Sequence, residues 1–254
     1  MGCVAGFCAA VTYKAFKGAK WKALTLLTAF LYPGITFGIF FFLNFFIWGQ
    51  ASSGAVPFGT MFALLVMWFG ISVPLVYLGS YFGYKLRRID FPTKTNLIPR
   101  SIPPQAWYTH PAFSVLVGGV LPFGAVFIEL FFILSSIWLH QYYYVFGFLL
   151  IVFLILIITC AEIAIVMCYF QLCAEDYDWW WRSFLTSGSS ALYLFIYSIV
   201  YMATKMVMTR GVSVLLYLGY MLITAYSFFM LTGAVGFVAS FYFVRAIYGA
   251  VKVE

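Results

Sequence analysis

The sequence YYVFGFLLIVFLILIITCAEIAIVMCYFQLC, residues 143–173, decides the fold class. Glu162 is its only charged residue. A helix of about 20 apolar residues is long enough to cross the roughly 30 Å hydrocarbon core of a bilayer. This segment exceeds that length and therefore predicts a transmembrane helix.

The rest of the chain has the same character. Of its 254 residues, 65% are hydrophobic and 8% are charged, and the mean hydropathy is +1.02. Soluble domains carry about 25% charged residues, so a soluble globule is excluded. We predict an all-α, polytopic transmembrane helix bundle of six full spans plus one partial N-terminal helix. The full spans are 23–48, 59–84, 112–139, 143–173, 189–201 or slightly beyond, and 212–244, and the partial helix is 2–13.

These spans form a single predicted integral-membrane domain over residues 1–254. Within it, residues 85–111 contain five prolines among charged residues, which predicts an irregular cytosolic linker that divides the bundle into halves.

Lysine and arginine are distributed unevenly between alternate loops. One set contains only Lys205 and Arg210. The other contains Lys14, Lys17, Lys20, Lys22, Lys85, Arg87, Arg88, Lys94, Arg100, Arg182, Arg245 and Lys252. Because cytosolic loops are rich in these residues, the larger set is predicted to be cytosolic, together with the C-terminus. The basic residues that give the net charge of +7 are thus interpreted as markers of topology. We predict a lipid bilayer as a partner of the protein, and no nucleic acid.

Two kinds of backbone feature recur inside the spans. Pro33, Pro74 and Pro122 each remove a backbone hydrogen bond and predict local distortion of a helix. Two glycine pairs, Gly34 with Gly38 and Gly79 with Gly83, have the four-residue spacing that allows close helix approach. Such pairs serve either internal packing or association with another helix.

Glu129 and Glu162 are the only acidic residues within apolar runs. An ionised carboxylate in lipid is costly unless it is paired, hydrated or protonated, so both are candidate functional residues. Their positions in the predicted hairpin place them about 15 Å apart along the helix axes, which disfavours a shared proton. Each either faces a functional polar pocket or makes a buried structural hydrogen bond.

A tyrosine series is the second polar feature. Tyr193, Tyr197 and Tyr201 recur every four residues and continue to Lys205, which predicts a polar stripe along one helix. Asn44 from another span is a possible partner. The alternative is hydrogen bonding between helices by the tyrosine hydroxyls.

The segment CAEDYDWWWRSFLTSGSSALY, residues 173–193, is predicted to be a cytosolic interfacial loop. Its acids Glu175, Asp176 and Asp178 balance Arg182, and its three tryptophans suit the headgroup layer. Ser189 or Ser190 is predicted to cap the helix that follows. The chain contains no recognisable catalytic, cofactor-binding or metal-binding motif, so we predict neither an enzyme nor a cofactor.

Long irregular strings resemble the C-terminal membrane region of the transmembrane-9 superfamily, the nonaspanins. They are HPAFSVLVGGVLPFGAVFIELFFILSSIW, CAEIAIVMCYFQLCAEDYDWWWRSFLTSGSSALYLFIYS and the final KVE. The resemblance implies an integral membrane protein of the Golgi and endosomes. Family members have a signal peptide, a large lumenal domain and nine spans, so this chain looks like the C-terminal part, without the lumenal domain.

The resemblance implies two partners. Nonaspanins end in a Lys-x-Asp/Glu signal for the COPI coat, which Lys252 and Glu254 match. The family is also associated with sorting transmembrane cargo proteins that have glycine-rich or polar membrane segments. A trafficking protein retained by COPI is therefore the first functional hypothesis. The alternatives are a proton-coupled secondary transporter or channel-like protein that uses Glu129 and Glu162, and a subunit of a larger membrane assembly.

Overall fold

The computed structural model describes residues 2–50, 54–93, 98, 101–104, 107, 110–138, 142–205 and 211–251. Side chains are described in these ranges except at 129–138, 142–146 and 148.

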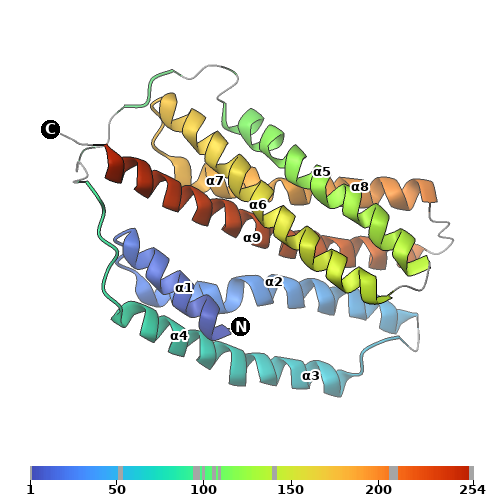
Figure 1. Cartoon of the computed structure of the whole chain (residues 1–254). Helices are drawn as coiled ribbons and strands as arrows, with labels where there is room; N and C mark the ends of the chain where they lie inside the picture. The colour runs from blue at the N-terminus through green and yellow to red at the C-terminus, as the bar shows by residue number, and fades with distance from the viewer. Residues whose placement is uncertain are drawn as a thin grey trace. The chain divides into compact units, whose positions relative to one another are not determined.

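The described chain is helical and contains no strand, which confirms the predicted fold class (Figure 1). Six of its helical segments are long and apolar enough to cross a membrane. The elements are α1 (Gly2–Ala15), α2 (Trp21–Gly49), α3 (Phe58–Met67), the π-helical turn η1 (Trp68–Ser72), α4 (Val73–Lys85), α5 (Pro111–Trp138), α6 (Tyr142–Cys173), α7 (Trp179–Gly188), α8 (Ser190–Lys205) and α9 (Gly211–Ala250).

The predicted spans agree with these helices, with one clear difference. Residues 179–188, predicted as a loop, form α7, so the fifth candidate span runs from Trp179 to Lys205. The sequence WWWRSFLTSG contains enough small and polar residues to conceal a helix from a hydropathy reading, but those residues are buried against neighbouring helices.

The chain divides into two compact units. Unit 1 comprises Met1–Phe91 and Met208–Tyr220, and unit 2 comprises Pro92–Val207 and Met221–Glu254. The first boundary falls within the predicted 85–111 linker, whose described residues between Leu86 and His110 include no α-helix. That these units form a single membrane domain remains a prediction.

In unit 1, glycines allow α1 to lie directly on α4. A Cβ added at Gly79 would overlap the carbonyl oxygen of Cys3, and one added at Gly6 would overlap that of Val76. Gly83 meets α1 one turn further along, at Phe7 and Ala10. The Gly79 and Gly83 pair therefore serves internal packing, one of the two alternatives that its spacing left open. By contrast, a Cβ at Gly38 on α2 would meet nothing within 4 Å.

The distortion predicted at Pro74 takes the form of η1, immediately before α4. Proline lacks the amide hydrogen that would continue the α-helical ladder, and a π-turn widens the backbone at that point. Within η1, Trp68 donates its indole hydrogen to the Ala29 carbonyl oxygen of α2 at 3.3 Å. Its ring stacks on Phe37, with centroids 5.2 Å apart. The turn thus fastens α2 to the middle of the Phe58–Lys85 span.

Asn44 on α2 organises the connection to α3. Its side-chain oxygen accepts from the Val56 amide at 2.9 Å, and its nitrogen donates to the Val56 carbonyl at 3.2 Å and to the Met61 sulfur at 3.0 Å. Asn44, considered above as a partner for the tyrosine stripe, therefore makes its hydrogen bonds within unit 1.

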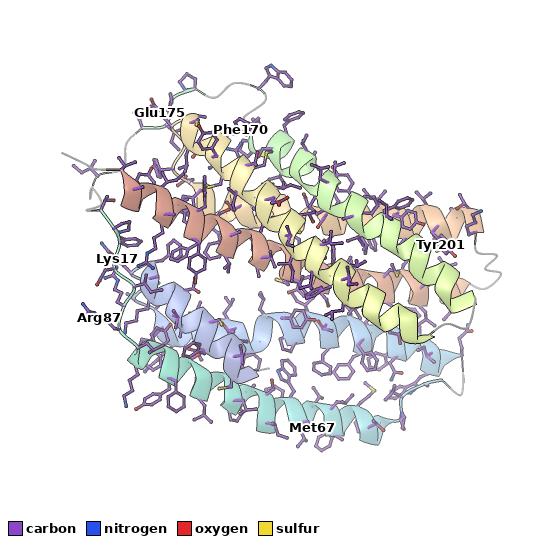
Figure 2. The ribbon with its side chains drawn as sticks, in the orientation of Figure 1. Lys17, Met67, Arg87, Phe170, Glu175 and Tyr201 are labelled. Atoms are coloured by element: carbon purple, nitrogen blue, oxygen red, sulfur yellow. The ribbon has the colours of Figure 1, made fainter. Side chains whose placement is uncertain are left out.

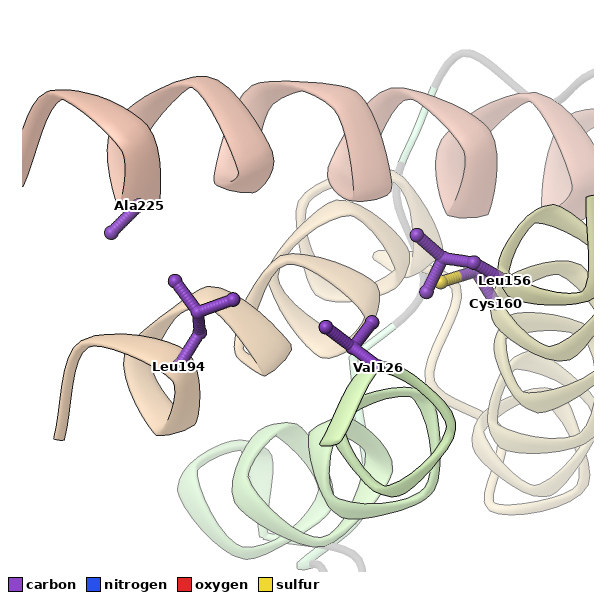
Figure 3. Close-up of a cluster of buried hydrophobic side chains, with 5 residues drawn as sticks. All are labelled: Val126, Leu156, Cys160, Leu194 and Ala225. Carbon is purple, nitrogen blue, oxygen red and sulfur yellow. The ribbon is translucent and has the colours of Figure 1, made fainter. Parts of the chain in front are cut away.

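In unit 2, four helices share one apolar core. Val126 of α5, Leu156 and Cys160 of α6, Leu194 of α8 and Ala225 of α9 point toward one another (Figure 3).

The short helix α7 is closely packed, since Trp179, Arg182, Ser183, Thr186, Ser187 and Gly188 are buried. A Cβ at Gly119 of α5 would overlap the Ser189 hydroxyl and crowd its backbone, and one at Gly236 of α9 would overlap the Ser187 hydroxyl. Ser189 donates to the carbonyls of Val115 at 2.6 Å and Thr186 at 2.8 Å, and Ser190 donates to Ser187 at 2.8 Å. The prediction that Ser189 or Ser190 caps a helix N-terminus was wrong, because these hydroxyls donate to carbonyls instead of accepting from amides.

Candidate functional site

Glu162 lies near the middle of α6 and points away from the packed side of that helix. Cys160 and Ala164, on either side of it in sequence, are 1% and 0% exposed, whereas Glu162 is exposed. Two residues along an α-helix correspond to about 200° of rotation, so Glu162 faces opposite to the core stripe. Ile158 and Val166, one turn before and after it, share its exposed face.

No described residue forms a hydrogen bond or an ion pair with the Glu162 carboxylate. The nearer end of α6, Cys173, is eleven residues away, or about 16 Å at the α-helical rise. Because α6 has 32 residues and is about 48 Å long, whereas the hydrocarbon core is roughly 30 Å thick, about 16 Å is the greatest distance of Glu162 from the nearer membrane face. An outward carboxylate within an apolar run is costly in lipid unless it is paired, hydrated or protonated.

The exposure of Glu129 cannot be compared with that of Glu162. Glu129 lies in α5, but its side chain lies outside the described residues. A role for Glu129 therefore remains a prediction.

The tyrosine stripe of α8 packs against α5. The Tyr193 hydroxyl donates to the Leu116 carbonyl oxygen at 2.8 Å. The Tyr197 ring meets Phe127 edge-on, with centroids 5.2 Å apart, and the Tyr201 ring lies 6.2 Å from that of Tyr197. For Tyr193, these contacts support the alternative of hydrogen bonding between helices.

A buried ion pair joins α5, α7 and the turn after α6. Arg182 donates from Nη1 to Oδ2 of Asp176 at 3.2 Å and from Nε to the Ser114 hydroxyl at 3.2 Å. The side chains of Arg182 and Asp176 are only 9% and 12% exposed. In Figure 2, this turn is marked by Phe170 and Glu175, at the opposite end of unit 2 from Tyr201. The predicted balance of Arg182 by nearby acids is confirmed for Asp176.

Ser114 and Gln171 were missed by the sequence analysis. Gln171 is 2% exposed, and its side-chain nitrogen has no hydrogen-bond partner within the described part of the chain. Neither residue carries a motif. The only signal, and for Ser114 alone, was that a guanidinium has five N–H donors, more than one carboxylate accepts.

The three tryptophans of residues 179–181 do not share one environment. Trp179 is 8% exposed and stacks on Phe237 with centroids 5.8 Å apart, whereas Trp181 is 70% exposed. Interfacial anchoring thus suits Trp181 but not Trp179.

Lys252 and Glu254, the predicted coat signal, lie outside the described residues. Among the residues that are described, no group of three or more His, Cys, Asp or Glu side chains lies close enough to hold a metal ion.

The long apolar helices and the few polar groups between them define a polytopic helical membrane protein. The family model described as Endomembrane protein 70 (EMP70) matches residues 1–212, and the chain belongs to this family, whose curated relatives are named transmembrane 9 superfamily members. Membership supports a membrane protein of the endomembrane system, and none of these names describes a catalytic activity.

The relatives are similar over the whole chain. Transmembrane 9 superfamily member 10 of Arabidopsis thaliana is 63% identical over 254 residues, 100% of this chain and 40% of the relative. Member 4 of Homo sapiens is 56% identical, with the same two shares. Member 2 of Mus musculus is 55% identical over 100% of this chain and 38% of its own length. The chain therefore spans about two fifths of the length of these relatives. No solved structure matches it.

Proposed function

We propose that this protein sorts other transmembrane proteins within Golgi and endosomal membranes by binding their membrane segments laterally. The observation that carries the proposal is Glu162, an exposed carboxylate near the middle of a 32-residue apolar helix with no partner in the described chain. Burying a charge at this depth costs roughly 3 kcal/mol on insertion scales. A cargo helix with a hydroxyl, amide or basic group at the same depth would offset that cost.

A second feature supports lateral binding. The surface of α2 at Gly38 leaves space for another helix, because a Cβ there meets nothing within 4 Å, whereas one at Gly34 would contact Trp68 at 3.8 Å. Small residues in this arrangement allow backbones to approach closely in lipid. This surface suits cargo segments that are themselves rich in glycine.

The proposal includes retention by the COPI coat through Lys252 and Glu254 on a cytosolic C-terminal tail. A lysine followed at two positions by an acidic residue forms a compact charged epitope for a coat subunit. The supporting observations are the family membership, the sequence match and the 12-to-2 division of lysine and arginine between loops.

The cargo proposal is tested with two reporter membrane proteins whose spans are identical except for one central residue, lysine in one and leucine in the other. Glu162→Gln in the full-length protein is expected to mislocalise the lysine reporter and leave the leucine reporter unchanged. Glu175→Gln, a carboxylate outside the spans, is the matched control. Equal sorting of the lysine reporter by wild type and Glu162→Gln would contradict the proposal.

The same variant distinguishes the transporter hypothesis. Glu162→Gln proteoliposomes that lose a pH-dependent solute flux while both reporters sort normally would favour a proton-coupled carrier.

The coat proposal has its own test. Lys252→Ser is expected to shift the full-length protein out of the Golgi and to abolish binding of purified coat to its tail. Lys205→Ser, in the loop predicted to lie on the other side of the membrane, is the control. Unchanged coat binding by Lys252→Ser would overturn this part.

A further inference from the structure

An open apolar groove of about 1050 Å³ lies between α2 and α4 in unit 1. Its α4 wall extends from Val73 to Lys85, and Trp21 and Thr25 of α2 face it. Twelve steps of 1.5 Å give a length of about 18 Å. This is close to one leaflet of a hydrocarbon core that is about 30 Å thick in total.

The two ends of the groove differ. One turn beyond Thr25, the indole of Trp68 binds the Ala29 carbonyl and packs on Phe30 and Phe37, so α2 and η1 are in direct contact there. The groove is therefore closed towards the middle of the span. The groove thus offers apolar surface over about one leaflet, which matches the length of an acyl chain.

The open end carries positive charge. Lys85 lines the groove, and the Lys22 ammonium lies 5.5 Å from the centroid of the Trp21 ring, which lines it too. Within the described chain, neither lysine forms an ion pair. A third cation, Lys14, donates to the Tyr84 carbonyl oxygen at 2.7 Å at the end of α4.

Tyr84 adds a polar group at the same end. Its hydroxyl is buried and has no hydrogen-bond partner among the described residues, and its ring meets Trp21 edge-on at 6.0 Å. Figure 2 shows Lys17 and Arg87 at this end of unit 1, away from Met67, the last residue of α3. Basic pockets between membrane helices suit anionic lipid headgroups.

We propose that this groove holds one anionic phospholipid, with an acyl chain along Pro74, Tyr77 and Leu78 and its phosphate near Lys22, Tyr84 and Lys85. This occupant fits because the groove is apolar over about one leaflet, and because two cations at its open end, Lys22 and Lys85, have no ion-pair partner in the described chain. The proposal is independent of the sorting function.

The test is native mass spectrometry of the full chain in detergent, titrated with dioleoylphosphatidylserine or dioleoylphosphatidylcholine. One phosphatidylserine is expected to bind in preference to phosphatidylcholine. The double variant Lys22→Gln/Lys85→Gln is expected to weaken its binding about thirtyfold, from two cations near an anionic headgroup. The control Lys17→Gln/Arg87→Gln removes equal charge at the same end, outside the groove lining, and is expected to bind as wild type does.

Four results would overturn the proposal. The first is equal binding of the two lipids, and the second is an equal loss in the control variant. The third is displacement of phosphatidylserine by a transmembrane polyleucine peptide, which would assign the groove to a helix. Glycerophosphoserine, which has the headgroup without acyl chains, is expected not to compete with phosphatidylserine. Competition by it, the fourth result, would indicate a phosphate site that needs no lipid. Leu78→Trp places a larger side chain in the groove and leaves the charges in place, and it is expected to reduce phosphatidylserine binding.

Discussion

Unit 1 and unit 2 are built from similarly apolar helices but pack them differently. In the most apolar 18-residue windows of the unit 2 spans Pro111–Ile128, Leu149–Cys173 and Trp179–Lys205, 28%, 22% and 50% of the residues are buried, and in Gly211–Ala250, which both units share, 6% are buried. In the corresponding windows of Trp21–Gly49 and Phe58–Lys85, in unit 1, 11% are buried. Unit 2 closes around hydroxyls and glycines at α7, whereas unit 1 leaves a groove between α2 and α4.

The difference shows which helix surfaces pack against one another in an apolar bundle. Hydrophobicity does not drive association between helices in lipid, so close packing and hydrogen bonds determine which surfaces are occupied. Where small residues and hydroxyls converge, as at Ser187 and Gly236, the bundle is sealed. Where large apolar side chains such as Tyr77 and Leu78 remain exposed, they line an open groove.

The largest expected effect is in unit 2, at the buried ion pair. Arg182→Met leaves Asp176 buried without its cation, and we expect the free energy of unfolding to fall by about 3 to 5 kcal/mol. Denaturant unfolding of the purified chain in micelles measures this loss. The control is Arg87→Gln, whose pair with Asp90 is 93% and 75% exposed and is expected to leave stability unchanged. Equal losses of stability in the two variants would show that the Arg182–Asp176 ion pair contributes no more than an exposed pair.

The next effect compares two glycines. Gly119→Ala places a methyl group against the Ser189 hydroxyl and the backbone of Ser189 and Ser190, and we expect a loss of about 1 to 3 kcal/mol from overpacking. Gly38→Ala, which meets open space, is expected to leave the unfolding midpoint unchanged or to raise it. A lower midpoint for Gly38→Ala than for Gly119→Ala would reverse the comparison.

A smaller effect is expected within unit 1. Asn44→Ala removes the side chain that binds both backbone groups of Val56, and should cost about 1 to 2 kcal/mol. Faster hydrogen exchange of the Val56 amide is the specific readout. Thr36→Ala is the control, since its hydroxyl bonds only within its own helix, to the Tyr32 carbonyl oxygen. Unchanged exchange at Val56 in Asn44→Ala would contradict the role assigned to Asn44.

The smallest effect concerns the tyrosine stripe. Tyr193→Phe removes the hydrogen bond to Leu116, and should cost about 0.6 kcal/mol, the average for interhelical bonds in a membrane protein. Tyr197→Phe keeps its ring contacts with Phe123 and Phe127 and is expected to be neutral. Thermal unfolding of the two variants side by side measures the difference, and a larger loss for Tyr197→Phe would show that its hydroxyl has a role beyond packing.

Hydropathy predicted the membrane-spanning helices because each contains a continuous apolar run, and Cys173 ends both the predicted and the observed fourth span. It failed at α7, where Arg182, Ser183 and Thr186 interrupt the run although all three are buried. Thr186 packs against Gly118 of α5, and the Ser183 carbonyl lies against Gly236 of α9, both of which are distant in sequence. A local sequence pattern does not predict contacts between residues so far apart in the chain.

The candidate site was predictable only in part. Glu162 is conspicuous in the sequence because it is a lone acid in an apolar run, but its outward direction depends on which face of α6 packs. The groove of unit 1 was not predicted, because it results from the π-turn before Pro74 and from Trp68 holding α2 at Ala29.

The most direct test of lateral cargo binding is photo-crosslinking from the face that carries Glu162. A photoreactive residue at Ile158 or Val166 in the full-length protein is expected to crosslink the lysine reporter described above. Crosslinking should be lost in the Glu162→Gln background and absent from Ile196, an exposed position on α8. Equal crosslinking of the lysine and leucine reporters, or crosslinking that persists in Glu162→Gln, would contradict the account.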